Sequence, residues 1–352
     1  MKKKICYIYT GGTIGMTATD AGYAPKKNYL REAMEAIEEL QREEMPRWDL
    51  VEFDPLLDSS NITVNEWNRI GRAISERYYD YDGFVVLHGT DTMAYTASAL
   101  SFMLEGLSKP VVLTGSQIPI GELRSDARDN IITAAMIAAE GRCPEVSLYF
   151  AGRLLRGNRT TKISSDEMLA FDTPNLPELA NAGIQIRYNE KIILPAGENF
   201  AFVPFVEDVP IAVLKVFPGI QFGLFEGIMT ESLKGMVLEA FGAGNIPQYD
   251  KKLIPIVQKA VRNGTVIIVC TQCLRGSVQL GTYETSGALK AAGALSGYDM
   301  TAEAAVAKLY YLFSKGYDAE KIRELFETNL CGELTKTETT ELPARHSQSP
   351  AD

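Results

Sequence analysis

Three short turns place hydroxyl or carboxyl side chains beside glycines, each directly after an apolar run. They are Thr10-Gly-Gly-Thr-Ile-Gly15, His88-Gly-Thr-Asp-Thr92 and Thr114-Gly-Ser-Gln117. Ligands of open α/β sheets bind beyond the carboxyl ends of the strands, so these turns are candidate sites. A threonine hydroxyl becomes an effective nucleophile when a neighbouring group accepts its proton. The turns therefore predict nucleophilic or ligand-binding chemistry at one edge of a sheet.

The first turn has competing interpretations. Gly11, Gly12 and Gly15 roughly imitate the glycine fingerprint of a dinucleotide or phosphate loop. However, the spacing departs from GxGxxG, no Walker lysine follows, and no acidic residue ends a strand about 20 residues later. A tight turn with N-capping threonines explains this segment as well as catalysis does. The first turn alone therefore decides nothing.

Few side chains are available to accept a proton from a threonine. The chain has only two histidines, His88 and His346, and the second lies in a polar C-terminal segment. A Ser-His-Asp triad is therefore almost excluded, and we expect His88 to pack at a strand end. Lysine, tyrosine and carboxylate side chains remain as candidates for proton transfer.

Taken together, the three turns resemble the asparaginase and glutaminase family, specifically its bacterial cytosolic type I asparaginases. The resemblance runs from Ile5 to about Gly332. Four further segments carry it: Asp58-Ser-Ser-Asn61, Arg156-Gly-Asn-Arg-Thr-Thr-Lys162, Gly242-Ala-Gly-Asn245 and Thr271-Gln-Cys273. This resemblance implies hydrolysis of L-asparagine to L-aspartate and ammonia.

The resemblance also implies catalytic roles. Thr13 matches the nucleophile, which would form a β-aspartyl ester, and Tyr23 matches the tyrosine of a mobile lid over 17–25. Thr90, Asp91 and Lys162 match a second catalytic group. Lys162 could polarise Thr90 only when transiently neutral, whereas Asp91 favours its charged form. Our hypothesis is that these three act as one coupled unit, which activates Thr13 or, later, a water molecule.

Further family positions concern the substrate and the assembly. Asp58, Ser59 and Ser60 match the turn that holds the substrate's α-carboxylate and α-amino groups, while Thr90 and Asp91 also face the substrate. Family members form close homodimers, or dimers of such dimers, in which Asn245 would reach into the partner's site. An ordinary turn explains Asn245 equally well. The resemblance implies no metal and no cofactor.

Some type I members bind asparagine at an allosteric site. Thr271 and Cys273 match residues of that site, but Glu239 stands where the family has an arginine. A carboxylate there would repel the α-carboxylate of asparagine. We therefore expect no allosteric activation by asparagine.

Three other functions stay open. A glutaminase-asparaginase would differ only in pocket depth, because one methylene separates the substrates. The related subunit that deamidates glutamine for tRNA-dependent amidation carries an extra amino-terminal domain, whereas Thr13 lies near the start of this chain. A catalytically silent amino-acid sensor would not need both threonines.

Composition narrows the class of protein. The formal net charge is −10, and no basic stripe could follow a phosphate backbone, so no nucleic-acid partner is expected. No apolar run reaches the length of a membrane span, and the run after Met1-Lys-Lys-Lys4 is too short for a signal peptide. The five cysteines fit free thiols in a reducing compartment, which suggests the cytoplasm. The Cys270–Cys273 pair lacks the further ligands that zinc needs.

Apolar runs and helical periodicity alternate along the chain. The expected strands of the first half are 5–9, 84–87, 111–113 and 146–150, with helices over 64–78, 92–104 and 125–139. Thr63 and Glu66 would form a capping box at the start of the first helix, and we expect Met136 on the inward face of the third. A hairpin of 185–188 with 191–194 would close this half. The second half repeats the alternation, with strands 211–217, 235–238 and 265–269 and helices 254–262, 301–314 and 319–326.

This alternation predicts an α/β fold with a mainly parallel sheet flanked by helices. We expect a larger N-terminal domain over 1–194, a linker over 195–210, and a smaller flavodoxin-like α/β domain over 211–334. The polar segment 335–352 is expected to be disordered.

Overall fold

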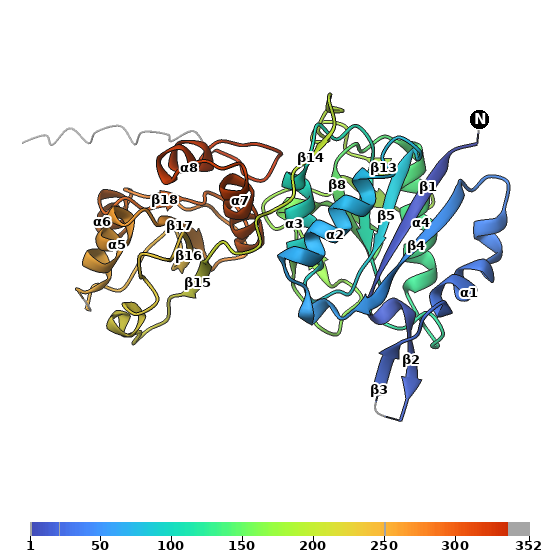
Figure 1. Cartoon of the computed structure of the whole chain (residues 1–352), viewed down its shortest axis with the longest axis horizontal. Coiled ribbons are helices and arrows are strands. Elements are labelled where there is room, and N and C mark those ends of the chain that lie inside the picture. Colours follow the sequence, from blue (N-terminus) through green and yellow to red (C-terminus); the bar gives the residue numbers. More distant parts are fainter. Residues whose placement is uncertain (1, 21, 250, 337–352) are drawn as a thin grey trace, which may run out of the picture.

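The computed structural model describes residues 2–20, 22–249 and 251–336. The chain forms two lobes, each built around its own sheet (Figure 1). The α/β class and the smaller second sheet are confirmed. The domain boundaries stay predictions.

The first lobe holds an eight-stranded sheet in the order β13-β12-β9-β8-β7-β5-β1-β4. Its parallel part consists of β4 (Arg47–Leu57), β1 (Lys4–Gly11), β5 (Gly83–Leu87), β7 (Val111–Thr114) and β8 (Val146–Phe150). Antiparallel strands complete it: β9 (Arg153–Arg156), β12 (Ala180–Ala182) and β13 (Ile186–Tyr188). The apolar runs form strands because both faces of the sheet are covered.

Alternate side chains of β1 enter two separate cores. Cys6 and Ile8 pack with α2 (Val64–Ser75) and α3 (Met93–Met103). Ile5, Tyr7 and Tyr9 pack with α1 (Tyr29–Glu35) and α4 (Ala127–Glu140) on the other face. The predicted capping box of Thr63 and Glu66 begins α2.

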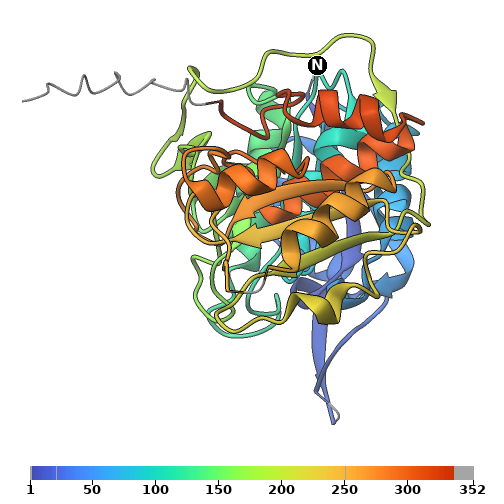
Figure 2. The ribbon, with the colours of Figure 1, turned by 90° about the vertical axis from the view of Figure 1, so that its left-hand side faces the viewer.

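The second lobe holds a parallel sheet in the order β15-β16-β17-β18. Figure 2 shows this lobe in front of the first. Its strands are β15 (Ile211–Lys215), β16 (Gly235–Ala240), β17 (Val266–Thr271) and β18 (Leu295–Ser296). Helices α5 (Leu253–Arg262) and α6 (Glu284–Ala291) share one core, and α7 (Ala302–Ser314) and α8 (Ala319–Phe326) share another. The layers are those of a doubly wound fold.

Helix α7 packs against α3 and joins the lobes. Within the expected linker, β14 (Ala201–Phe202) pairs with β6 (Leu104–Glu105) of the first lobe. Phe205 is buried, and its backbone bonds to the side chain of Asn68 in both directions. This part of the linker is therefore a strap on the first lobe.

The remaining elements are short. They are β2 (Met16–Thr19), β3 (Gly22–Pro25), β10 (Thr161–Lys162) and β11 (Phe171–Asp172), and five single 3-10 turns: η1 (Thr13–Gly15), η2 (Glu38–Gln41), η3 (Ser59–Asn61), η4 (Gly157–Arg159) and η5 (Phe222–Phe225). Strands β2 and β3 form a hairpin that projects from the first lobe (Figure 1).

Three expectations need correction. The partner of β13 is Ala180–Ala182, not 191–194, because the chain forms a turn directly after β13, where the Ile192 N–H donates to the Asn189 carbonyl. Met136 of α4 is exposed, because Ala134, Ile137 and Ala138 face the sheet instead. Thr335 is held by the carboxylate of Asp299, and the rest of the expected tail, beyond residue 336, lies outside the described residues.

Candidate functional site

Three turns meet at the carboxyl ends of β1, β5 and β4. Gly12 has a φ of +88°, and a Cβ atom there would lie 2.4 Å from the Cα atom of Gly89. A Cβ atom on Gly89 would in turn lie 2.4 Å from Oγ of Ser59. Only glycine permits these approaches. The two predicted turns and the turn at Ser59 therefore stand against one another.

Thr13 begins the η1 turn directly after this contact. Thr13 is half-buried, and Ile14 and Gly15 behind it are buried. Strand β3 of the projecting hairpin lies against η1. Thr13 thus lies where the first turn, the Gly89 turn and the hairpin come together.

Lys162 connects two parts of the predicted second group. Its Nζ atom donates hydrogen bonds to Oγ1 of Thr90 at 2.9 Å and to Oδ1 of Asp91 at 2.7 Å. Thr90 is buried, the Lys162 side chain is 19% exposed and that of Asp91 is 62% exposed. The ammonium group therefore links a buried hydroxyl to a carboxylate that stays open to a ligand.

The turn over 58–60 is fixed by its own bonds. Oδ1 of Asp58 accepts a hydrogen bond from the Ser60 backbone N–H at 3.0 Å, and Thr92 Oγ1 donates to the Ser59 carbonyl at 2.7 Å. Ser59 is buried, whereas Asp58 and Ser60 are exposed. A hydroxyl, a carboxylate and backbone groups are thereby presented beside Gly89.

His88 lies buried at the end of β5, as expected. Nδ1 lies 2.7 Å from the Gly89 carbonyl and Nε2 lies 3.0 Å from Thr96 Oγ1. Burial lowers the pKa of His88 to about 4, although the Gly89 carbonyl opposes the shift. The ring is therefore neutral at pH 7, and both of its nitrogen atoms have hydrogen-bond partners. His88 stabilises the turn and does not take part in proton transfer.

Tyr23 lies on β3, with 53% of its surface exposed. The hydrogen bond to the Glu122 carboxylate raises the pKa of Tyr23, and slight burial adds to this shift. No described hydrogen bond joins Tyr23 to Thr13, and the hairpin that carries Tyr23 projects from the first lobe (Figure 1). Glu122 was not predicted as a site residue from the sequence, because it belongs to no motif or periodic pattern there.

Asn245 lies in the second lobe. Its Oδ1 atom accepts a hydrogen bond from Thr285 Oγ1 at 2.8 Å, and Gly244 before it has a φ of +109°. The described contacts within this chain do not bring Asn245 to the other site residues.

Thr271 and Cys273 line a cavity of about 210 Å³, together with Glu239 and Glu303. The Cys273 backbone N–H donates to Thr271 Oγ1 at 3.0 Å. Burial raises the pKa of Glu303, and the charge of Glu239 contributes to the shift. Two carboxylates therefore face this cavity.

The third turn has a structural role. Thr114 Oγ1 donates to the Tyr149 carbonyl and Ser116 Oγ to that of Ile118. The Asp126 carboxylate accepts the backbone N–H groups of Gln117 and Ile118. These hydroxyl groups therefore bond to backbone carbonyls of the first lobe, and they stabilise the carboxyl end of β7 beside His88.

The described residues contain no group of three side chains suited to hold a metal ion. All five cysteines carry free thiols. Within the same residues, no helix is long and apolar enough to span a bilayer.

Both lobes of the chain match known proteins. The family model "Asparaginase, N-terminal" matches residues 4–194 and the "Glutaminase/Asparaginase C-terminal domain" matches residues 210–326. The L-asparaginase 1 of Escherichia coli (strain K12) is 47% identical over 336 residues, which cover 95% of this chain and 99% of that protein. The chain belongs to the asparaginase family.

Other family members extend the comparison. The crystal structure of L-asparaginase I from Vibrio cholerae superimposes with a TM-score of 0.88 at 42% identity, covering 96% of this chain and 100% of that one. The 60 kDa lysophospholipase of Mus musculus is 38% identical over 357 residues, which cover 95% of this chain and 63% of that protein. The chain is thus also similar to a protein that is named for another reaction.

Proposed function

We propose that the protein is an L-asparaginase that hydrolyses L-asparagine to L-aspartate and ammonia, with Thr13 as the nucleophile. The observation that carries this proposal is the bonding of Lys162 to Thr90 and Asp91, beside the turn of Thr13. A family fold alone would not specify the reaction. A hydroxyl nucleophile and a second proton-transfer group together do so.

The proposed reaction has two halves. Oγ1 of Thr13 attacks the side-chain amide carbon, its proton passes to the departing nitrogen, and ammonia leaves a β-aspartyl ester on Thr13. Water then adds to the ester carbon, and Thr13 leaves with a proton as aspartate forms. The Thr90, Lys162 and Asp91 unit relays a proton in one or both halves.

Recognition of the α-amino acid follows from the groups around Gly89. The exposed carboxylate of Asp91 suits the α-ammonium, and the turn of Asp58, Ser59 and Ser60 suits the zwitterion's remaining polar atoms. A simple amide would make no ion pair with Asp91 and would leave the buried Ser59 hydroxyl without a ligand partner, which costs about 1–3 kcal/mol. The site therefore selects an amino-acid amide.

Tyr23 enters the site when the β2–β3 hairpin closes. In that state its hydroxyl would join the proton transfer at Thr13, and the hairpin would exclude water from the ester. The contact of Tyr23 with Glu122 belongs to the open state described here.

A homodimer would complete the site with Asn245 of the partner. The edge strand β15 and the segment after it expose apolar side chains, Val213, Phe217, Leu224 and Ile228, each 48–75% exposed. Such a concentration of apolar side chains is typical of an interaction surface. Sedimentation velocity tests this: a monomer at assay concentration would contradict the role of Asn245.

We place the enzyme in the cytoplasm.

The cavity of Thr271 and Cys273 does not bind asparagine as an activator in this proposal. The carboxylates of Glu239 and Glu303 repel the α-carboxylate of such a ligand. Initial rates should follow a hyperbola against asparagine concentration, and a sigmoidal curve would contradict this.

The experiment that tests the function compares asparagine and glutamine. Wild type should release ammonia from asparagine, and kcat/KM for glutamine should be lower by about 10- to 200-fold, the usual effect of one methylene. Thr13→Ala should release almost none. Equal kcat/KM values would indicate a glutaminase-asparaginase, and no release by wild type would favour a sensor.

A further inference from the structure

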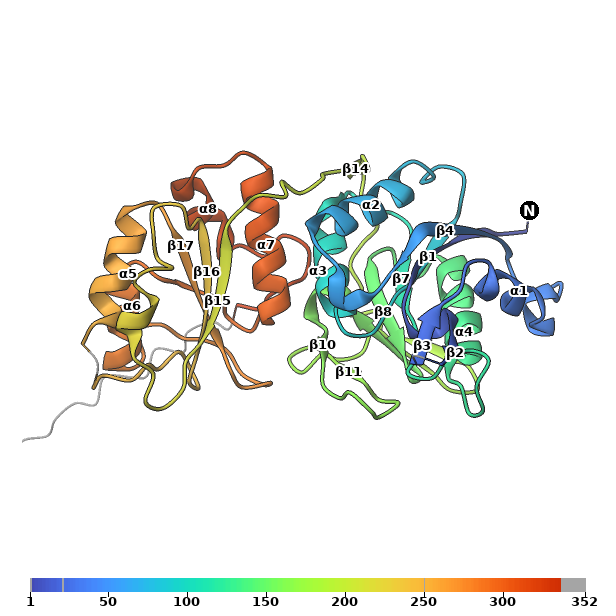
Figure 3. The same cartoon turned by 60° about the horizontal axis from the view of Figure 1, so that its bottom comes forward.

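The segment that carries Lys162 has little support from its own sheet. Strand β10 consists of Thr161 and Lys162, and it pairs with the equally short β11. Figure 3 shows both strands on the side of the first lobe that faces the second. Catalytic side chains must be held within about 0.5 Å of the productive geometry. Two residue pairs alone do not fix a long side chain to that degree.

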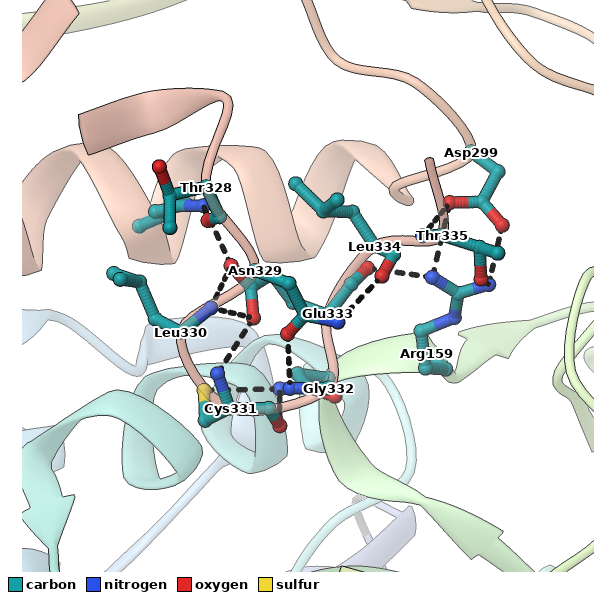
Figure 4. A network of polar contacts seen from close by, with 12 residues as sticks. Arg159, Asp299, Thr328, Asn329, Leu330, Cys331, Gly332, Glu333, Leu334 and Thr335 are labelled. Carbon is teal, nitrogen blue, oxygen red and sulfur yellow. Dashed lines mark hydrogen bonds and ion pairs between the residues drawn. The ribbon is translucent and has the colours of Figure 1, made fainter. Parts of the chain in front are cut away.

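Arg159, three residues before Lys162, ties this segment to the second lobe. Its Nη1 and Nη2 atoms lie 3.0 and 2.5 Å from the two carboxylate oxygens of Asp299. Nη1 also donates to the Glu333 carbonyl at 2.8 Å, and Nη2 to the Asn175 carbonyl at 3.3 Å. Arg159 is 2% exposed and Asp299 8%. The guanidinium is therefore buried and bonded to three partners, Asp299, Glu333 and Asn175. Figure 4 shows Arg159 pointing toward Asp299 and the segment of Glu333 to Thr335.

The second-lobe side of this contact is itself fixed. The Glu333 carboxylate accepts the backbone N–H groups of Leu330 and Cys331 and pairs with Lys308 at 2.5 Å, and both members of that pair are fully buried. The Thr335 N–H donates to Asp299 at 2.7 Å. Asp299 is thus part of a rigid network and not a mobile surface carboxylate.

We infer that Arg159, held by Asp299, is a positioning residue that sets the place of Lys162 beside Thr90. This inference rests on the proposed function and adds the second lobe of the same chain to the catalytic apparatus. A lysine side chain cannot replace the arginine, because it cannot make the paired contacts to one carboxylate and two carbonyls. Asp299 and Arg159 do not touch the substrate turns, so substrate binding should be nearly unaffected.

The test uses Arg159→Lys and Asp299→Asn, which keep the size of each side chain. Each should lower kcat for asparagine on the order of 10- to 100-fold with KM nearly unchanged. The control is Lys315→Met, which breaks the Lys315–Glu105 ion pair between the lobes at the far end of α7. It should keep the wild-type kcat. Rates are divided by the concentration of folded protein. If one of the two variants folds poorly, the kcat and KM of the other variant still test the inference.

A double-mutant cycle separates positioning from a purely structural role. In a Lys162→Met background, Arg159→Lys should not lower the residual rate further, because Arg159 acts through Lys162. A full multiplicative loss in that background, or a rise in KM without a fall in kcat, would overturn the inference. Absence of ammonia release by wild type would instead refute the proposed function.

Discussion

The Nζ atom of Lys162 lies 2.9 Å from Oγ1 of Thr90, although 72 residues separate the two in the chain. The same ammonium lies 2.7 Å from Asp91. A lysine in this position can act by giving and taking a proton or as a fixed positive charge, and the two roles respond differently to substitution.

Lys162→Met should lower kcat on the order of 10²- to 10⁴-fold, the usual contribution of acid–base catalysis. Lys162→Arg should not restore it, because a guanidinium stays protonated in proteins. Steady-state rates with asparagine measure both. Activity near wild type in Lys162→Arg would show that the charge alone suffices.

Tyr23→Phe removes the hydroxyl that takes part in proton transfer at Thr13 once the hairpin has closed. It should therefore lower kcat on the order of 10²-fold or more. Glu122→Gln is the matched variant, because it weakens the contact that holds Tyr23 in the open hairpin without altering the phenol. Its kcat should stay near wild type. Equal kcat values for Tyr23→Phe and wild type would remove Tyr23 from the mechanism.

Gly12→Ala should destabilise the protein and inactivate it. A φ of +88° costs about 1–3 kcal/mol for a non-glycine residue, and the new Cβ atom would meet the Gly89 backbone. Gly183→Ala is the control, because no atom lies within 4 Å of a Cβ there. Urea unfolding and ammonia release measure both effects. A fully active, equally stable Gly12→Ala would show that the two turns are not in contact.

His88 should make stability dependent on pH. Its pKa is about 4 in the folded protein and about 6.5 in an unfolded chain, so below pH 6.5 the unfolded state binds more protons. Stability is complete above about pH 6.5 and falls as the pH approaches 4, with about 2 kcal/mol lost at pH 5. Unfolding of wild type and His88→Gln at pH 7 and pH 5 measures the difference. An identical loss in both would assign the pH effect to other groups.

The sequence predicted elements whose signals are local. The apolar runs of β1, β5, β7 and β8 are buried on both faces, and the Thr63 capping box begins α2. The long strand β4 was missed because it lies at the edge of its sheet, where polar residues interrupt the apolar pattern. The error at Met136 arose because several registers of an alanine-rich helix give an apolar face.

Contacts between distant segments could not be predicted from local patterns. Arg159 and Asp299 stand 140 residues apart, and neither carries a signal that names the other. The contact of Gly12 with Gly89 likewise depends on the order of the strands, which places β1 beside β5. Only the resemblance to a family brought Thr13, Thr90, Asp91 and Lys162 together before the structure did.

The most direct test of the mechanism is to locate the acyl group. Wild type and Lys162→Met are mixed with asparagine, quenched in acid within milliseconds, digested and analysed by mass spectrometry. A β-aspartyl ester on the peptide of Thr13, absent from Thr13→Ala, is the predicted result. An ester on Thr90 instead, or rapid turnover by Thr13→Ala, would contradict the assignment of Thr13 as the nucleophile.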